Sequence, residues 1–230
     1  MRWQLLLLTL CACGGQAPSF ERTGVLRPGG TMIVRNISGD IDAYAPRHDQ
    51  PPDQYTIQSF SASRATIVHA DAAVVYVTAA SPGIHYLIRG AKDTTLILQT
   101  RSGTINVADF DGDVDARDER GDVKMLLPQY GNAWVEKGNL SVTVGSAGWP
   151  GTLHFVLQRG DAEIYVNATA PARVHLHTAN GTIYTDFPLR GSSSGHSETI
   201  DAPINGGASR GIDVEVNNGS IRLLQLKPQV

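Results

Sequence analysis

Cysteine is scarce in this chain of 230 residues: the two that it has, Cys11 and Cys13, both lie near the N-terminus. Residues 14–230 contain none, so that part of the chain cannot be stabilised by internal disulfides. A domain built from it must be held by backbone hydrogen bonds and by an apolar core. The arrangement excludes a disulfide-rich secreted scaffold and leaves the two cysteines for another role.

Long apolar runs, aromatic side chains and an excess of either charge are also lacking. Beyond the first residues, no apolar run is long enough to cross a bilayer. Lys plus Arg number 19 against 22 Asp plus Glu, and no basic run suggests a nucleic-acid partner. Aromatic residues are 7% of the chain and glycines number 24, while no segment has helical periodicity. The composition indicates thin, turn-rich β-structure.

Signatures of catalysis are missing as well. There is no Gly-x-Ser-x-Gly and no His-Glu-x-x-His, and Gly206-Gly207 is not followed by the helix that a phosphate cradle requires. We therefore expect a protein that is not an enzyme and that needs no cofactor. Two alternatives are a carbohydrate-active β-helix enzyme and an envelope stress or assembly accessory that binds another protein. The enzyme would need catalytic groups on adjacent coils of one face. In the glycine repeat described below, the residue three positions after the glycine is expected to point outward on each coil. These residues are dissimilar: Asp115, Lys124, Ser141, Glu163, Tyr184 and Arg222.

The most regular feature present is a frame of three residues: Gly, then Asp, Thr, Asn or Ser, then an aliphatic residue. Its eight copies begin at Gly39, Gly103, Gly112, Gly121, Gly138, Gly160, Gly181 and Gly219. Such a repeat is typical of structural units stacked on one another. Glycine permits positive φ at a corner, and the aliphatic residue begins a short strand. The frame predicts an all-β fold, a single-stranded β-helix (β-solenoid) of about ten coils.

Period-two alternation after each frame separates inner from outer residues. The expected inner residues are Ile105, Val107, Val114, Val123, Met125, Leu140, Val142, Phe155, Leu157, Ile164, Val166, Val174, Leu176, Ile183, Val214, Val216, Ile221 and Leu223. An open final coil would be an unpaired edge, so the ends need caps. The irregular segments near residues 16–30 and 224–230 are expected to supply them.

Residues 1–12 have the form of a signal peptide, with Arg2 as the positive charge and an apolar run at residues 5–10. Leu10 and Ala12 stand three and one positions before Cys13, which resembles the bacterial lipobox. In that motif the cysteine carries a lipid that includes palmitate, and it becomes the first residue of the mature chain. An ordinary secretory signal is the alternative.

The lipoprotein interpretation divides the chain into a signal peptide (1–12), a lipidated Cys13 with a tether (13–22), a β-solenoid domain (23–226) and a tail (227–230). Gly14, rather than aspartate, follows Cys13, which resembles lipoproteins of the outer membrane in bacteria with two membranes. We expect a lipid-anchored protein of the bacterial cell envelope.

Two stretches carry a resemblance to a known family. They are residues 27–41 (Arg-Pro-Gly-Gly-Thr-Met-Ile-Val-Arg-Asn-Ile-Ser-Gly-Asp-Ile) and residues 204–207 (Ile-Asn-Gly-Gly) with 214–223 (Val-Glu-Val-Asn-Asn-Gly-Ser-Ile-Arg-Leu). The chain resembles the putative-adhesin β-helix domains of bacterial envelope proteins over residues 23–226. The resemblance implies right-handed winding and a binding or spacing role toward an envelope protein or a glycan. It implies no catalytic residues.

Two sequence motifs resemble binding sites but have a simpler structural explanation. Arg120-Gly121-Asp122 and Arg159-Gly160-Asp161 spell the integrin-recognition tripeptide, but Gly-Asp is the corner of the frame. The acidic residues between 109 and 119 have the oxygen ligands that calcium prefers. They lack the spacing of an EF-hand, and a solvated outer face is favoured.

Three histidines are weak candidates for a surface metal site, although we expect no metal. His154 and His175 are 21 residues apart, the local repeat length, and His177 follows on the same face. Neighbouring coils would place His154 and His175 side by side, where they could bind zinc or copper. An exposed ladder of polar side chains is the alternative.

Overall fold

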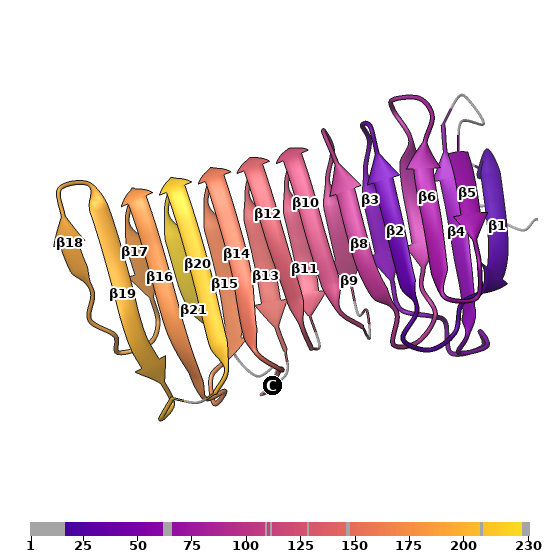
Figure 1. Ribbon diagram of the computed structural model, residues 1–230. Helices are drawn as coiled ribbons and strands as arrows, with labels where there is room; N and C mark the ends of the chain where they lie inside the picture. The colour runs from indigo at the N-terminus through magenta and orange to yellow at the C-terminus, as the bar shows by residue number, and fades with distance from the viewer. Residues whose placement is uncertain are drawn as a thin grey trace, which may run out of the picture.

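The computed structural model describes residues 17–61, 66–108, 110, 112–127, 129–145, 148–207 and 209–226. In this part of the chain there is no helix, and the strands form two large mixed sheets stacked into an elongated body (Figure 1). The prediction of an all-β fold is confirmed. No helix of the described residues has the length and apolarity needed to cross a membrane.

The two sheets hold ten and eleven strands. Sheet A contains, in spatial order, β1 (Phe20–Val25), β4 (Gln54–Phe60), β7 (His85–Arg89), β3 (Ile41–Tyr44), β9 (Ile105–Ala108), β11 (Val123–Leu127), β13 (Leu140–Val144), β15 (Ala162–Asn167), β21 (Ile221–Leu226) and β17 (Ile183–Thr185). Sheet B contains, in spatial order, β18 (Ser192–Ser194), β19 (Ser197–Ile204), β16 (Ala172–Asn180), β20 (Gly211–Asn218), β14 (Thr152–Arg159), β12 (Gly131–Lys137), β10 (Val114–Arg120), β8 (Thr95–Thr100), β2 (Thr31–Asn36), β6 (Val74–Ala79) and β5 (Thr66–Ala70).

From β8 to β15 the chain alternates between the sheets, so that each repeat adds one strand to sheet B and one to sheet A. Strands of successive repeats pair in parallel and in register. Val123 lies beside Leu140, and Leu140 lies beside Ala162. The aliphatic position of each frame is therefore stacked on the same position of the next. The described residues thus form an all-β fold of two large mixed sheets, and the single-stranded β-helix stays a prediction.

The core lies between the sheets, and the predicted inner residues line it. All of them are buried except Ile183, which is half-buried and packs against the core. Its strand, β17, is the last strand of sheet A at this end and pairs with β21 alone. Period-two alternation thus identified the inner face. Ile183 is less buried because its strand lies at the edge of sheet A.

The repeats do not stack in sequence order at either end. β2 and β3 lie between the β6–β7 and β8–β9 repeats, and β20 and β21 lie between the β14–β15 and β16–β17 repeats. Ile164 therefore pairs with Leu223, and Ile183 pairs with Ile221. The 21-residue spacing of Gly160 and Gly181 predicts that Ile164 and Ile183 stand on neighbouring repeats, and this prediction is wrong. The first and last parallel repeats in the sequence are each held by a parallel partner on both sides.

Antiparallel strands close the ends of the stack (Figure 1). At one end β4 pairs with β7, β1 pairs with β4, and β5 pairs with β6. At the other end β19 pairs with β16, and β18 pairs with β19. The segment 224–230 was expected to be a cap, but β21 runs to Leu226 in the interior of sheet A. The polar strand β18 supplies an edge with little apolar surface for another sheet to pair with.

The corner glycines form a row in which neighbouring backbones touch. In spatial order the row contains Gly39, Gly103, Gly121, Gly138, Gly160, Gly219 and Gly181. From Gly103 onward, a Cβ on each glycine would collide with the carbonyl of the glycine before it. All but Gly181 also have positive φ, between 107° and 158°. The frame predicts positive φ at the Gly181 corner as well, and this prediction is wrong. The close approach of the Gly219 carbonyl explains the glycine there.

The second residue of the frame links one repeat to the next. Asp122 Oδ1 accepts the Asn139 amide N–H at 2.8 Å, and Asn139 Oδ1 accepts the Asp161 N–H at 3.1 Å. Asp161 Oδ1 accepts the Ser220 N–H at 2.7 Å. Short side chains with an acceptor oxygen can reach this neighbouring amide, which accounts for Asp and Asn in the frame.

Polar side chains also point into the core three positions before four of the corner glycines. They are Asn36, Thr100, Asp118 and Thr178, and all are buried. Thr178 Oγ1 donates to the Gly219 carbonyl at 2.8 Å, and Asn36 Nδ2 donates to the Ile84 carbonyl at 2.7 Å. In both cases the carbonyl belongs to the neighbouring repeat, so at these two corners the polar side chain supplies a hydrogen-bond donor, whereas the same position before Gly138, Gly160 and Gly219 is apolar.

Candidate functional site

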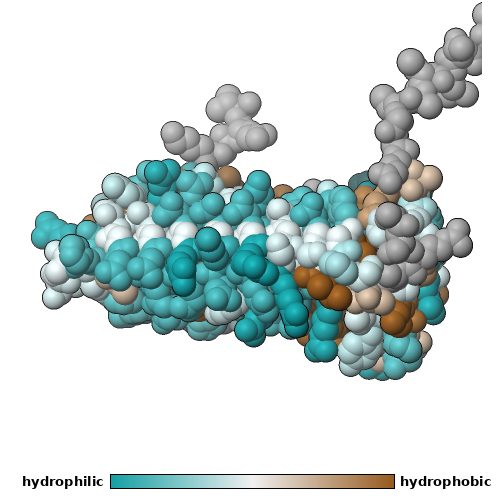
Figure 2. All heavy atoms as spheres, turned by 90° about the horizontal axis from the view of Figure 1, so that it is seen from above, coloured by the Kyte–Doolittle hydropathy of each residue, from teal (hydrophilic) through white to brown (hydrophobic). Residues whose placement is uncertain are grey.

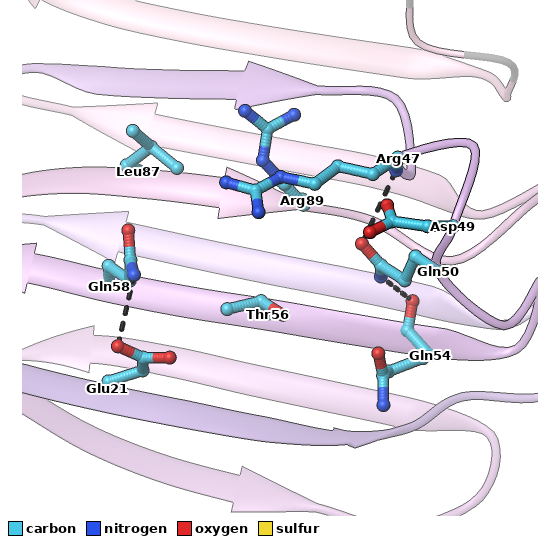
Figure 3. Close-up of a pocket in the computed structure, with 9 residues that line it drawn as sticks. All are labelled: Glu21, Arg47, Asp49, Gln50, Gln54, Thr56, Gln58, Leu87 and Arg89. Atoms are coloured by element: carbon cyan, nitrogen blue, oxygen red, sulfur yellow. Dashed lines mark hydrogen bonds between the residues drawn. The ribbon is translucent and has the colours of Figure 1, made fainter.

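A polar hollow on the outer face of sheet A is a candidate site. It has a volume of about 200 Å³ and lies over β1, β4 and β7, beside the segment that joins β3 to β4 (Figure 3). Its lining residues are Glu21, Arg47, Asp49, Gln50, Gln54, Thr56, Gln58, Leu87 and Arg89. All of these residues except Leu87 are polar or charged.

Strand alternation positions the floor of the hollow. β4 buries Tyr55 and Ile57 and turns Gln54, Thr56 and Gln58 outward. Across the antiparallel pair, Thr56 lies opposite Arg89 and Gln58 lies opposite Leu87. The hydrophobic residues of β4 therefore fix its polar face toward solvent.

Hydrogen bonds hold part of the lining in place. Gln58 Nε2 donates to Glu21 Oε2 at 3.1 Å, which ties β4 to β1. Gln50 Nε2 donates to the Gln54 carbonyl at 2.5 Å, and Gln50 Oε1 accepts the Arg47 amide N–H at 3.4 Å (Figure 3). Within the described part of the chain, the side chain of Gln54 and the Oε1 atom of Gln58 have no hydrogen-bond partner.

Arg89 is the most constrained cation of the hollow. Its guanidinium lies 5.3 Å from the centre of the Tyr44 ring, and Nη1 donates to the Ala45 carbonyl at 3.5 Å. Its Nε is buried and has no hydrogen-bond partner among the described residues. With Arg47 it supplies two positive charges against the carboxylates of Glu21 and Asp49, so the hollow is balanced in charge.

The sequence did not point to this hollow. The repeat frame does not reach residues 54–60, and the prolines at 46, 51 and 52 indicate a loop just before them. The usable signal was the alternation in Gln-Tyr-Thr-Ile-Gln-Ser-Phe, which is the pattern of a half-buried strand. That signal gives the outward face but not its opposition to Arg89, which depends on antiparallel pairing.

The three histidines are not arranged as we expected. β20 lies between β14 and β16, so Asp213 stands between His154 and His175. His154 Nδ1 is 3.3 Å from Asp213 Oδ2, and His175 Nδ1 is 4.0 Å from Asp201 Oδ2. The expectation that His154 and His175 lie side by side is wrong, because the last repeat inserts between theirs.

His177 lies on a different row of the same face, where its Nδ1 is 2.9 Å from Thr199 Oγ1. Within the described part of the chain, no three His, Cys, Asp or Glu side chains are grouped closely enough to hold a metal ion. The row of His154, Asp213, His175 and Asp201 is an alternating polar ladder across four strands.

The remaining sequence candidates have structural roles or lie elsewhere. Asp122 and Asp161, from the two Arg-Gly-Asp strings, accept backbone hydrogen bonds from the next repeat. Asp113 and Asp115 are exposed, and burial raises the pKa of Asp115 while Arg117 opposes the change. Cys13, the predicted lipidation site, lies outside the described residues.

No family model matches the chain, and no curated protein does either. Several solved structures resemble it. One, described as a putative cell adhesion protein from Clostridium sporogenes, has 11% identity and a TM-score of 0.47, and the match covers 91% of this chain and 100% of that one.

Another, described as a putative adhesin from Bacteroides fragilis, has 8% identity and a TM-score of 0.35, with 91% and 100% covered. A structure described as a putative lipid binding protein from Parabacteroides distasonis has 9% identity and a TM-score of 0.23, with 91% and 98% covered. Likeness at this level gives no ligand or partner for the present chain.

Proposed function

We propose that the chain is a non-enzymatic binding module of the bacterial cell envelope, lipid-anchored at Cys13, which holds a glycan in the polar hollow of sheet A. The observation that carries the proposal is the lining of that hollow. The Gln54 and Gln58 amides, the Thr56 hydroxyl and two guanidinium groups face one shallow space. Sugar hydroxyls donate and accept hydrogen bonds, and amide and hydroxyl side chains can do both.

The fold supports a role as a rod that presents this surface. We interpret the alternation of strands between the sheets as a flattened β-solenoid, with one strand of each repeat in each sheet. Such a body is stabilised by contacts between neighbouring repeats and offers two long faces for binding. Figure 2 shows a mostly hydrophilic surface along its length.

The position of the proposed anchor gives the rod a direction. Cys13 is seven residues before Phe20, the first residue of β1, so the lipid would be at most about 25 Å from one end of the stack. Figure 2 shows hydrophobic residues gathered toward the end that carries β1. Val25, Ile67 and Tyr76 are 60%, 46% and 45% exposed there. That end would face the outer membrane, with β18 and β19 pointing away.

Replacing Cys13 with serine should release the protein from the membrane fraction, because the only proposed acyl attachment is lost. Cys11→Ser is the matched control and should remain membrane-bound. The measurement is fractionation of cells followed by labelling with a palmitate analogue. Membrane association and labelling that persist in Cys13→Ser would contradict the anchor.

An array of neutral envelope polysaccharides identifies a glycan that the unmodified protein binds. The double variant Gln58→Ala with Arg47→Ala should bind that glycan more weakly. Loss of two hydrogen-bonding groups is worth roughly 2 kcal/mol, or about 30-fold in affinity. Ser141→Ala, on the same sheet but away from the hollow, is the control and should bind normally.

The same incubation distinguishes binding from catalysis. A binding module leaves the polysaccharide at its original length, as measured by size-exclusion chromatography and by the number of reducing ends. Shortening of the polymer would overturn the non-enzymatic proposal in favour of a carbohydrate-active enzyme. Equal binding by the double variant and the control would overturn the assignment of the hollow.

A further inference from the structure

A second hollow lies on the opposite sheet and is distinguished by its charge. Arg35 on β2, Arg101 directly after β8 and Arg117 on β10 border a space of about 430 Å³ on sheet B. All three arginines are exposed, and Glu119 is the one carboxylate among the lining residues. Three guanidinium groups against one carboxylate concentrate positive charge in a chain whose net charge is −3.

These arginines are not engaged in ion pairs within the described residues. Elsewhere, Arg173 pairs with Asp201 at 2.7 Å and Arg222 pairs with Glu163 at 3.1 Å. Arg35, Arg101 and Arg117 have no ion pair or side-chain hydrogen bond to any residue that the structure describes. Their donors are therefore available to an anion from solution.

The spacing of the arginines is set by the parallel strands. Arg35 lies beside Gln99, and Gln99 lies beside Arg117, so the three side chains form one row across β2, β8 and β10. Strands in a sheet are about 4.8 Å apart, which separates Arg35 from Arg117 by roughly 10 Å at the backbone. Arg101 projects from the same face two residues beyond Gln99.

An aromatic residue completes the row. Trp134 on β12 lies beside Arg117, and the Arg117 guanidinium is 4.3 Å from the centre of its ring. This cation–π contact orients Arg117 without consuming its hydrogen-bond donors.

We propose that this hollow binds an acidic glycan, a polysaccharide segment bearing carboxylates such as that of a uronic acid. A planar carboxylate matches the paired donors of a guanidinium. The separation of Arg35 from Arg117 is comparable to the length of a disaccharide unit in an extended chain, so carboxylates on alternate sugars would reach both. Gln99 lies between them to bond hydroxyls. The site is on the other sheet from the hollow of the proposed function and takes a different class of glycan.

The test uses two matched probes: an oligomer of galacturonic acid and the same oligomer with its carboxyls methyl-esterified. Isothermal titration of the purified chain should give binding of the acid oligomer, at least about tenfold weaker binding of the ester, and loss of affinity as salt rises. Arg35→Gln with Arg117→Gln should weaken binding of the acid oligomer by about tenfold or more. Arg173→Gln, on the same sheet but paired with Asp201, is the control.

Several outcomes would overturn the inference. They are equal binding of acid and ester, unchanged binding by the double arginine variant, or binding to phosphatidylglycerol vesicles with none to the oligomer. Thermal unfolding of each variant checks that the exposed substitutions leave the fold intact. Trp134→Phe keeps an aromatic face and should retain most of the affinity, whereas Trp134→Ala should not. Gln58→Ala with Arg47→Ala should leave acid binding unchanged, so a failure here is separable from a failure at sheet A.

Discussion

Asp118→Asn should stabilise the protein at pH 8 by about 2–3 kcal/mol, the reverse of the usual effect of a substitution in the core. The Asp118 side chain is fully buried, and its Oδ1 accepts the Arg120 amide N–H at 2.9 Å. Its Oδ2 has no partner among the described residues. Together with the Gly103 carbonyl, Oδ2 borders the space that a Cβ on Gly121 would occupy.

Two other repeats that carry a polar residue at the equivalent position show which bond Asp118 lacks. Thr178 Oγ1 and the Gly219 carbonyl border the Cβ position of Gly181 in the same way, and there the hydroxyl donates to the carbonyl at 2.8 Å. Asn36 also stands three positions before its glycine and donates to a neighbouring carbonyl. An ionised aspartate has no proton to donate. Asparagine keeps the shape and the acceptor and adds the missing donor.

The gain should depend on pH. The pKa of Asp118 is raised from 3.8 to about 6. Burial is the largest cause, and the carboxylates of Asp122, Glu119 and Asp40 add to it. The hydrogen bond from the Arg120 backbone N–H lowers the pKa and opposes them. Because the folded-state pKa is above the unfolded value, the stability from the neutral carboxyl is fully present below about pH 3.8. It is lost as pH rises through about 6. The difference corresponds to about 3 kcal/mol.

Urea unfolding at pH 4 and pH 8 measures this dependence. Asp118→Asn should be near wild type in stability at pH 4 and clearly more stable at pH 8. Asp113→Asn, an exposed carboxylate just before the same strand, is the control and should show no such difference. A variant that is destabilised at pH 8, or that gains equally at both pH values, would contradict a requirement for a donor.

Gly138→Ala should cost about 4 kcal/mol, a large loss for the addition of one methyl group. Its φ of 150° is in the region that side chains avoid, which contributes roughly 1–3 kcal/mol. The added Cβ would also collide with the Gly121 carbonyl, and crowding of this kind costs roughly 1–3 kcal/mol more. The backbone could yield only by separating two repeats that pair in register.

Gly29→Ala separates the two causes. Gly29 has φ of 73°, but nothing lies within 4 Å of its Cβ position, so only backbone strain is added. It should lose about 1–2 kcal/mol, measured by the same urea unfolding. Equal losses in the two variants would mean that the close approach of the glycine row contributes nothing.

The repeat frame made much of the fold predictable, because it encodes interactions between neighbours. The aliphatic residues of the frames became the core, and Asp122 and Asn139 bond the next repeat's backbone. The sequence predicted that the glycines of the frame lie at corners, but it did not predict why position 181 must be glycine. Positive φ is a local property, whereas the Gly219 carbonyl reaches Gly181 only because the last repeat inserts beside it.

Neither candidate binding site could be found from spacing along the chain. Arg89 and Thr56 are brought together by antiparallel pairing, and Arg35 and Arg117 by insertion of β2 beside β8. A one-dimensional pattern gives the face on which a side chain lies. It does not give the strand that lies next to it, because pairing depends on which strands cover the ends.

The sequence by itself determined an all-β chain, the inner residues of its strands and the residue types of its corners, since each follows from local sterics and period-two alternation. The tertiary structure alone decided the order of the strands, the antiparallel caps and both hollows. Parallel pairing is satisfied equally well by any repeat of matching length and register. The choice among repeats rests on closing the two open edges, a property of the whole stack.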